Sequence, residues 1–364
     1  MTDDKTIRVL VADDSAFMRK MIGEILRNAG MDVVATAFDG FDALQKTRQF
    51  KPDVITLDVE MPRMNGVEFL DALMKEQPTP VLVLSSLTDS GADATMQCLE
   101  RGAYDCLHKP SGSISLNIAK MGDEIVKKVI EAVSNNRDKQ NSRQSGGAVS
   151  SPPPAPLPRP LNNNVRSFVQ GHPVVLIASS TGGPAALQRV VPKLSADLGA
   201  AVIIVQHLPV GFTGPLANRL NNISHINVRE ACEGERLEVG TALVAPAGKH
   251  LSFNTRGEIV LTMEPPLWGV RPAADMAFQS AAQIFRNRVV GAVLTGMGRD
   301  GALGARAIQN NGGICYAQDE ASCVIFGMPR AAWEAGGVHE LLNIDLIAPA
   351  IEEAVRLKLR KIAA

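Results

Sequence analysis

The stretch VVLIASSTGGP, residues 174–184, changes character within a few positions. Val174–Ala178 is continuously apolar, as expected for a strand that is buried on both faces of a sheet. Small polar residues and two glycines follow, and Pro184 suits the first turn of a helix. A strand that enters a helix through a tight polar turn is typical of α/β proteins, and such a turn displays the Ser180 hydroxyl at the sheet edge. The same residues could also be an ordinary turn and helix cap.

This strand–turn–helix pattern recurs through residues 171–364. Further buried strands are expected at Ala201–Gln206, Val289–Leu294 and Ile314–Ala317. Helical segments are expected after Pro184, Thr213, Asp275, Gly301 and Pro329. Residues 226–262 alternate instead and turn at Gly248 and Gly257, which predicts hairpin-like strands. We therefore expect a doubly wound α/β domain with a small antiparallel hairpin addition.

Residues 1–134 show the same alternation of short apolar runs and segments with helical spacing. The apolar runs are Ile7–Ala12, Val33–Thr36, Val54–Leu57, Val81–Leu84 and Tyr104–Leu107. Strands that alternate with helices favour a parallel sheet covered on both faces. We expect a flavodoxin-like α/β domain with a five-stranded parallel sheet.

A change of composition separates the two predicted domains. Residues 141–164, NSRQSGGAVSSPPPAPLPRPLNNN, contain no acidic or aromatic residue and few large apolar ones. Such a segment cannot bury enough surface to offset its ordering entropy, and its prolines favour an extended spacer. We therefore expect an N-terminal domain at 1–134, a linker at 135–170 and a C-terminal domain at 171–364.

The composition of the 364 residues narrows the classes of function. Lys and Arg total 37 and Asp and Glu total 38, so the chain lacks the positive charge typical of nucleic-acid-binding proteins. The five cysteines include no C-x-x-C pair, which argues against a disulfide framework or a zinc site. The N-terminus lacks the charge pattern of a signal peptide, and no apolar run is long enough to span a bilayer. We expect a cytoplasmic protein without membrane insertion.

Charged and hydroxyl side chains directly follow the strands predicted in the N-terminal domain. Asp13 and Asp14 follow the first strand and Asp58 follows the third, while Ser85 ends the fourth and Lys109 follows the fifth. The carboxyl ends of parallel strands face one crevice, so these side chains should converge. Crowded carboxylates require a cation, and Mg²⁺ prefers oxygen ligands. The lysine can pair with a carboxylate or with a phosphoryl oxygen.

These residues stand in the motifs VADDS, TLDVEMPRMNG, SS and HKP, and residues 5–134 resemble a response-regulator receiver domain. The resemblance implies that Asp58 accepts a phosphoryl group from a histidine kinase. The residues that the family pattern assigns to Mg²⁺ binding are Asp13, Asp14 and Asp58, and those assigned to phosphoryl binding are Ser85 and Lys109. Cys106 departs from the pattern, because many receivers have an aromatic residue there that rotates on activation.

Three residues that could form a catalytic triad follow separate strands of the C-terminal domain. Ser180 lies on the turn described above, His207 follows the second strand, and Asp300 lies in LTGMGRDGALG after the third. A serine hydroxyl needs an imidazole to take its proton, and the imidazole needs a carboxylate to orient it. The histidines of this domain that are expected at the surface, in turns or at a strand edge, are His225, His250 and His339.

The glycine-rich stretch also fits a nucleotide-binding loop. Residues 296–301 have the G-x-G-x-x-G spacing between a strand and a helix, and Asp319 follows the next strand where a ribose-binding acid is expected. However, Asp300 would repel a pyrophosphate at the helix N-terminus. A nucleotide site would also leave the positions of the serine and histidine unexplained. We therefore favour the triad over a nucleotide-dependent oxidoreductase, with a phosphorylation-controlled binding adaptor as a further alternative.

The motifs SSTGGP, QHLPVGF, APAGKH, RPAADMAF, LTGMGRDGALG and DEASCVIFGMPR resemble, in this order, the catalytic domain of the chemotaxis protein-glutamate methylesterases. The resemblance implies hydrolysis of glutamate γ-methyl esters on the cytoplasmic helices of methyl-accepting chemoreceptors, and deamidation of specific receptor glutamines. It implies an acyl-enzyme mechanism with Ser180 as nucleophile, His207 as base and Asp300 as its orienter, and no cofactor for this step. The backbone amide of Met297 would contribute to the oxyanion hole, and Thr181 would lie near the site.

The family pattern usually has an alanine where this chain has Ser179, so two serines are adjacent. Ser180 is the expected nucleophile because it aligns with the Ser-Thr-Gly-Gly register. We also expect the unphosphorylated receiver to block the catalytic edge and phosphorylation of Asp58 to relieve this inhibition.

Overall fold

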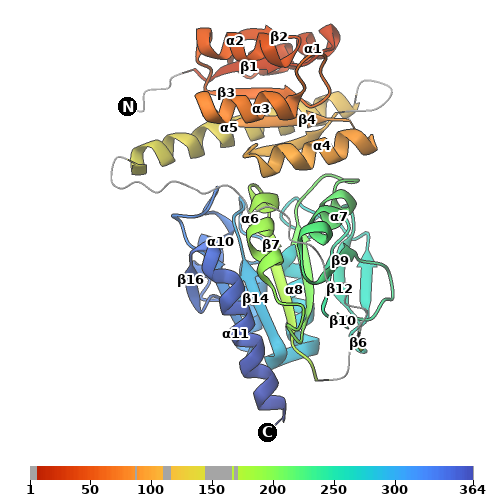
Figure 1. Ribbon diagram of the computed structural model, residues 1–364. Coiled ribbons are helices and arrows are strands. Elements are labelled where there is room, and N and C mark those ends of the chain that lie inside the picture. The colour runs from red at the N-terminus through yellow and green to blue at the C-terminus, as the bar shows by residue number, and fades with distance from the viewer. Residues whose placement is uncertain (1–5, 87, 110–115, 144–165, 168–170, 364) are drawn as a thin grey trace. The chain divides into compact units, whose positions relative to one another are not determined.

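The computed structural model describes residues 6–86, 88–109, 116–143, 166–167 and 171–363, and it divides the chain into two compact units, Met1–Ser151 and Pro152–Ala364. Both units are parallel sheets with covering helices (Figure 1). None of the helices in these ranges combines the length and apolar composition that crossing a bilayer requires.

The first unit contains a five-stranded parallel sheet with the order β2-β1-β3-β4-β5, which confirms the predicted flavodoxin-like arrangement. Helix α1 packs against α5, whereas α3 packs against both α2 and α4 (Figure 1). The strands are β1 (Arg8–Ala12), β2 (Asp32–Ala37), β3 (Val54–Asp58), β4 (Val81–Ser85) and β5 (Asp105–His108). The helices are α1 (Ala16–Asn28), α2 (Gly40–Phe50), α3 (Gly66–Glu76), α4 (Asp89–Glu100) and α5 (Leu116–Arg143).

Short polar residues start the helices that follow the strands of this unit. Ser15 caps α1 by accepting a hydrogen bond from the Met18 amide. Asn65 and Glu68 form a capping box at the start of α3. These caps give a hydrogen-bond partner to amides of the first helical turn, which have none within the helix.

The second unit is built on a seven-stranded parallel sheet with the order β16-β15-β14-β7-β8-β11-β9, so the predicted doubly wound domain is confirmed. Helix α6 packs against α7 and α11, whereas α9 packs against α8 and α10. The sheet strands are β7 (Val174–Ser179), β8 (Ala201–Gln206), β9 (Asn227–Glu230), β11 (Thr241–Val244), β14 (Val289–Val293), β15 (Ile314–Gln318) and β16 (Glu340–Leu342). The helices are α6 (Gly183–Val190), η1 (Val191–Lys193), α7 (Thr213–Ile223), α8 (Ala274–Phe285), η2 (Arg286–Arg288), α9 (Ala302–Asn310), α10 (Met328–Glu334) and α11 (Ile344–Ala363).

Residues 226–262 form two kinds of strand. Strands β12 (His250–Phe253) and β13 (Ile259–Thr262) make the predicted antiparallel hairpin. The hairpin prediction was wrong for β9 and β11, which pair in parallel beside β8. The reason is that helix α7 lies between β8 and β9, and residues 231–240 lie between β9 and β11, so these strands are joined by crossover connections and not by the tight turn of a hairpin. A second small antiparallel pair joins β6 (Arg166–Ser167) to β10 (Glu238–Val239).

The predicted linker at 135–170 overlaps the end of the first unit. Helix α5 continues to Arg143, so residues 135–143 are helical. No glycine or proline lies between Gly122 and Gly146 to end the helix earlier. Of the remaining linker residues, 144–165 and 168–170 lie outside the described residues, and β6 lies between them.

Helices α8 and α9 approach each other closely beside the second sheet. A Cβ atom on Gly304 would lie 2.4 Å from the Cβ of Phe278, so only glycine fits at this crossing. Small residues of α8, including Ala274, Ala277 and Ala281, belong to the apolar core that this pair of helices covers. The close approach brings the N-termini of the two helices together at the carboxyl edge of the sheet.

Candidate phosphoacceptor pocket and candidate active site

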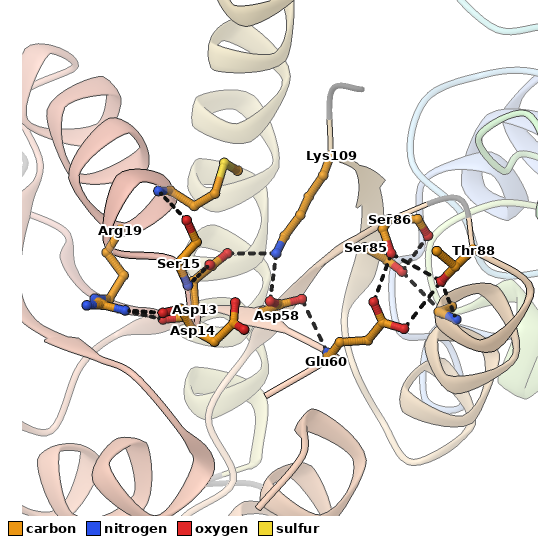
Figure 2. A network of polar contacts seen from close by, with 12 residues as sticks. Asp13, Asp14, Ser15, Arg19, Asp58, Glu60, Ser85, Ser86, Thr88 and Lys109 are labelled. Atoms are coloured by element: carbon orange, nitrogen blue, oxygen red, sulfur yellow. Dashed lines mark hydrogen bonds and ion pairs between the residues drawn. The ribbon is translucent and has the colours of Figure 1, made fainter. Parts of the chain in front are cut away.

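Three carboxylates gather at the carboxyl edge of the first sheet. Asp13 and Asp14 follow β1, and Asp58 is the last residue of β3. Each offers an oxygen atom, and these oxygens lie within 4.8 Å of one another (Figure 2). Asp13 and Asp58 are buried while Asp14 is exposed, so the cluster is open to solvent on one side.

Lys109, directly after β5, reaches into the same pocket. Its Nζ lies 2.8 Å from Asp13 Oδ2 and 2.7 Å from Asp58 Oδ2 (Figure 2). Burial lowers the pKa of this lysine, but attraction and hydrogen bonds from the two carboxylates outweigh burial and raise the pKa above its ordinary value. The lysine therefore stays charged and neutralises part of the negative charge in the pocket.

The surroundings of Asp58 disfavour the ionised form of its carboxyl group. Burial raises its pKa to about 6, against the lowering effect of Lys109, and the charge of Asp13 adds repulsion. The Glu60 amide donates to Asp58 Oδ1 at 3.3 Å. Further positive charge would relieve the remaining cost of ionising this carboxyl group.

The donor set of the pocket fits a hard divalent cation such as Mg²⁺. Asp13, Asp14 and Asp58 offer carboxylate oxygens, which are the ligands that this ion prefers. The Ser15 amide orients Asp13 by donating to its Oδ1 at 2.9 Å. A bound cation would supply charge neutralisation to oxygen atoms in the pocket.

The loop between β4 and α4 carries hydroxyl groups on another side of the pocket. The Ser85 hydroxyl points toward the carbonyl oxygens of Ser86 and Gly91, at 3.1 and 3.2 Å. The Glu60 carboxylate accepts hydrogen bonds from Ser86 Oγ at 3.1 Å and from Thr88 Oγ1 at 3.3 Å (Figure 2). Glu60, which was not predicted from the sequence, therefore ties the β3–α3 loop to the loop that follows Ser85.

Cys106 lies buried in β5, at the position where the receiver pattern often has an aromatic residue. Burial raises the pKa of its thiol well above the usual range. The side chain therefore acts as a small apolar residue of the sheet.

The second candidate site lies at the carboxyl edge of the seven-stranded sheet. Strand β7 lies between β8 and β14 in this sheet. Ser180 lies in the loop after β7, His207 in the loop after β8 and Asp300 in the loop after β14. The Ser180 amide donates to the Thr295 carbonyl at 3.0 Å, and the His207 amide donates to the Ser179 carbonyl at 3.1 Å. These bonds continue the strand pairing beyond the strand ends, so the loops leave the sheet side by side.

His207 and Asp300 form a direct pair. His207 Nε2 lies 2.8 Å from Asp300 Oδ2. An ionised carboxylate can only accept hydrogen bonds, so the ring nitrogen that faces it carries the proton. In the neutral imidazole, Nδ1 then has a free lone pair and can act as a base.

Backbone amides hold Asp300 in place, and its side chain is buried, with 2% of the residue exposed. Oδ2 accepts from the Ala274 amide at 2.6 Å, and Oδ1 accepts from the Asp275 amide at 2.9 Å and the Gly301 amide at 3.0 Å. The first two amides belong to the start of α8, where the helix dipole favours negative charge. The backbone amides thus fix the position of the carboxylate independently of the imidazole.

Asp275 makes the reciprocal contact from α8 to α9. Its Oδ1 accepts from the Gly304 amide at 2.7 Å, and its Oδ2 accepts from Trp268 Nε1 at 2.8 Å. Burial raises the pKa of Asp275, and the charge of Asp300 raises it further. Amides at the start of α8 thus donate to Asp300, which precedes α9, while an amide of α9 donates to Asp275 of α8. These hydrogen bonds hold the two helix starts together.

The adjacent serines differ in their surroundings. Ser179 is fully buried, and its hydroxyl donates to Gln206 Oε1 at 2.6 Å. The same glutamine donates from Nε2 to the carbonyl oxygens of Ser180 and His207, at 2.8 and 2.9 Å. Ser179 is thus part of a buried polar network that shapes both loops, whereas Ser180 is 9% exposed at the turn.

The backbone after β14 passes very close to the Ser180 turn. A Cβ atom on Gly296 would lie 2.8 Å from Ser180 Cβ, so glycine is required there. Met297 follows and is 40% exposed. Thr181 is buried, and its carbonyl oxygen accepts from Thr295 Oγ1 at 3.0 Å. The peptide group of Met297 therefore lies in the loop that borders the serine.

The contacts at α9 argue against a nucleotide site. Two amides at its start already donate to carboxylates, Gly301 to Asp300 and Gly304 to Asp275. Asp319, the expected ribose-binding acid, accepts from the Ser322 amide at 3.0 Å within its own loop. The amides and the acid that a dinucleotide would use are thus engaged in internal contacts.

Comparison with known proteins identifies the family. A sequence model of the CheB methylesterase family matches residues 175–351, and one of the response regulator receiver domain matches residues 9–119. The protein-glutamate methylesterase/protein-glutamine glutaminase of Symbiobacterium thermophilum is 45% identical, covering 96% of this chain and 98% of its own. The chain belongs to the CheB methylesterase family. The protein of the same name from Pyrococcus horikoshii is 44% identical over 97% of this chain and 95% of its own. The crystal structure of the Thermotoga maritima CheB methylesterase catalytic domain is 37% identical and covers 50% of this chain and 98% of its own, with a TM-score of 0.49.

Two residues that support the site in this CheB-family chain, Gln206 and Asp275, were not predicted from the sequence. The surface position expected for His250 was wrong, because this residue is 1% exposed and both ring nitrogens contact backbone groups. Its place in the APAGKH motif was the available signal, but a histidine at a strand edge does not reveal which segment covers it.

Proposed function

We propose that this chain is a phosphorylation-activated protein-glutamate methylesterase. It removes methyl groups from glutamate γ-methyl esters of chemoreceptors and deamidates specific receptor glutamines, which gives adaptation in bacterial chemotaxis. The observation that supports this most is the contact between the buried Asp300 and the partly buried His207 beside the Ser180 turn, in a chain 45% identical to a protein-glutamate methylesterase.

The contacts at the sheet edge support an acyl-enzyme mechanism. Asp300 holds the imidazole of His207 so that Nδ1 takes the proton of Ser180 as its Oγ attacks the ester carbonyl. Backbone N–H groups that include Met297 stabilise the oxyanion, with Thr181 beside the turn. The imidazolium then gives this proton to the leaving group as its bond to the carbonyl carbon breaks, so that it departs as methanol, or as ammonia in deamidation. Water attacks the acyl-enzyme by the same route and releases the glutamate, and no metal or cofactor takes part.

The first unit acts as the switch in this proposal. A histidine kinase supplies the phosphoryl group and Asp58 accepts it. Asp13, Asp14 and Asp58 would hold Mg²⁺, which would supply charge neutralisation there. Lys109, already 2.7 Å from Asp58 Oδ2, would pair with a phosphoryl oxygen. The Ser85 hydroxyl would turn from the backbone carbonyls to the same group. Phosphorylation then relieves inhibition of the catalytic unit.

The partners follow from this activity. The substrates are cytoplasmic helices of methyl-accepting chemoreceptors and the phosphodonor is a histidine kinase, so the chain works in the cytoplasm, with no nucleic acid involved. We retain the division into a receiver at 1–134, a linker at 135–170 and a methylesterase domain at 171–364, with α5 of the receiver extending to Arg143.

A methanol-release assay on methylated receptor, with and without a small phosphodonor, tests the function. The full-length chain should release methanol faster with the phosphodonor, and Asp58→Asn should abolish this increase. Intact receptor binding without methanol release would instead support a binding adaptor.

Adjacent serine variants test the nucleophile. Ser180→Ala should lower kcat on the order of 10⁶-fold because the attacking oxygen is lost. Ser179→Ala should retain most of the activity, with a stability loss of about 1–3 kcal/mol, since it leaves Gln206 Oε1 without its buried donor. Activity that survives in Ser180→Ala and disappears in Ser179→Ala would refute the assignment of the nucleophile.

A further inference from the structure

His250 lies beneath the segment that leads into helix α8. It is the first residue of β12 and is 1% exposed. The Ala273 amide donates to its Nδ1 at 3.1 Å, and its Nε2 lies 3.2 Å from the Pro265 carbonyl oxygen. The ring therefore bridges two points of the connection between the hairpin and α8.

These contacts define the protonation of the ring. A backbone N–H can only donate, so Nδ1 of His250 must carry a lone pair toward Ala273. A carbonyl oxygen can only accept, so Nε2 must carry the hydrogen toward Pro265. The geometry thus fits one neutral tautomer in one orientation.

Other contacts tie Arg271 of the same connection to residues that flank the hairpin. Arg271 Nη1 donates to the carbonyl oxygens of Met263 and Glu264, at 3.0 and 2.9 Å. The Gly248 amide donates to the Arg271 carbonyl oxygen at 2.9 Å. The segment is therefore anchored at Arg271 and again at Ala273.

The amides that follow this anchor hold the carboxylate of the candidate triad. The amide of Ala274, directly after Ala273, donates to Asp300 Oδ2 at 2.6 Å, and the amide of Asp275 donates to Oδ1 at 2.9 Å. The imidazole of His207 contacts the same Oδ2 atom at 2.8 Å. A short chain of contacts thus runs from His250 through consecutive amides to the catalytic carboxylate.

We propose that His250 is a positioning residue for the triad, which fixes the amides of residues 273–275 through its Nδ1 and thereby aligns Asp300 with His207. This inference rests on the proposed methylesterase function. Loss of the Nδ1 acceptor leaves a buried N–H unpaired and lets the start of α8 shift. The effect falls on kcat, because misplacing a catalytic group by about 1 Å costs on the order of 10²-fold in rate.

Two substitutions separate the ring nitrogens. In His250→Asn, the amide oxygen takes the place of Nδ1 and can accept from Ala273, whereas in His250→Gln the amide nitrogen takes the place of Nε2 and donates to Pro265. In the full-length chain with a phosphodonor, His250→Gln and His250→Ala should lower kcat about 10- to 100-fold with little change in KM. His250→Asn should stay within about threefold of the unmodified chain.

Thermal unfolding of the same variants separates positioning from stability. Asn and Gln variants that unfold at similar temperatures but differ in kcat support the proposal. Folded His250→Gln with unchanged kcat, or equal losses in both variants, would overturn it. Nitrogen NMR of the labelled His250 ring should show Nδ1 without a proton and Nε2 with one, and the opposite tautomer would overturn the proposal independently of activity. If the unmodified chain releases no methanol, the proposed function fails, whereas the tautomer measurement still tests the geometry.

Discussion

The two candidate sites occupy the same position in two parallel sheets, yet they stabilise their carboxylates differently. In the first unit, Asp58 faces Asp13 and depends on Lys109 to offset the charge. In the second, Asp300 accepts hydrogen bonds from backbone amides at the starts of two helices. A carboxylate surrounded by other charges can exchange protons, cations and phosphoryl groups, while one fixed by amides serves to orient a neighbour. The residue type alone therefore does not set the role of an acid at a strand end.

Among the changes that test this contrast between the two acids, Asp300→Asn should have the largest effect. One oxygen becomes an NH₂ group, which cannot accept from the amides or from His207, and the imidazole loses its orienting partner. We expect kcat on methylated receptor to fall about 10⁴-fold while receptor binding persists. A fall of less than about tenfold would mean that Asp300 does not act on His207, and would remove the contrast between the two acids.

A smaller effect concerns proton competition at Asp58. Because burial raises its pKa to about 6, the carboxyl group is protonated below that pH and cannot bind a cation. Mg²⁺ affinity, measured by calorimetry, should be steady above about 6 and weaken about tenfold for each pH unit below it. The Asp58→Asn variant should bind weakly with little change over this range. A flat profile in the unmodified chain would show that Asp58 is ionised throughout.

The smallest of these three effects should come from Glu60→Ala. This change removes the carboxylate that accepts from Ser86 and Thr88, and so frees the loop that follows Ser85. We expect phosphorylation by a small phosphodonor to become about two- to fivefold faster, as for the loss of weak exposed hydrogen bonds. Glu60→Gln, which keeps an acceptor oxygen, is the matched control and should change less. An equal change in both variants would point to the charge rather than to the tie between the loops.

Sequence patterns predicted the alternation of strands and helices because continuous apolar runs and helix-start residues are local signals. The five-stranded sheet and the helices after Thr213 and Asp275 required no more than this. The parallel direction in which β9 and β11 pair was not predictable in the same way. Parallel and antiparallel pairing bury similar side chains and depend on distant partners. The extension of α5 to Arg143 was missed because composition was taken to mark the linker, although no helix-breaking residue is present.

The sequence by itself determined which residues follow the strands, and therefore which side chains can meet at each sheet edge. It could not determine that the Asp275 amide donates to Asp300 while the Gly304 amide donates to Asp275. Nor could it determine that the Ser179 hydroxyl donates to Gln206, or that His250 is buried beneath the start of α8. These contacts join segments far apart in the chain, and their hydrogen bonds form only when helices and loops pack to within bonding distance. Tertiary structure alone decided them, because a polar side chain in a sequence does not reveal which backbone groups will be buried against it.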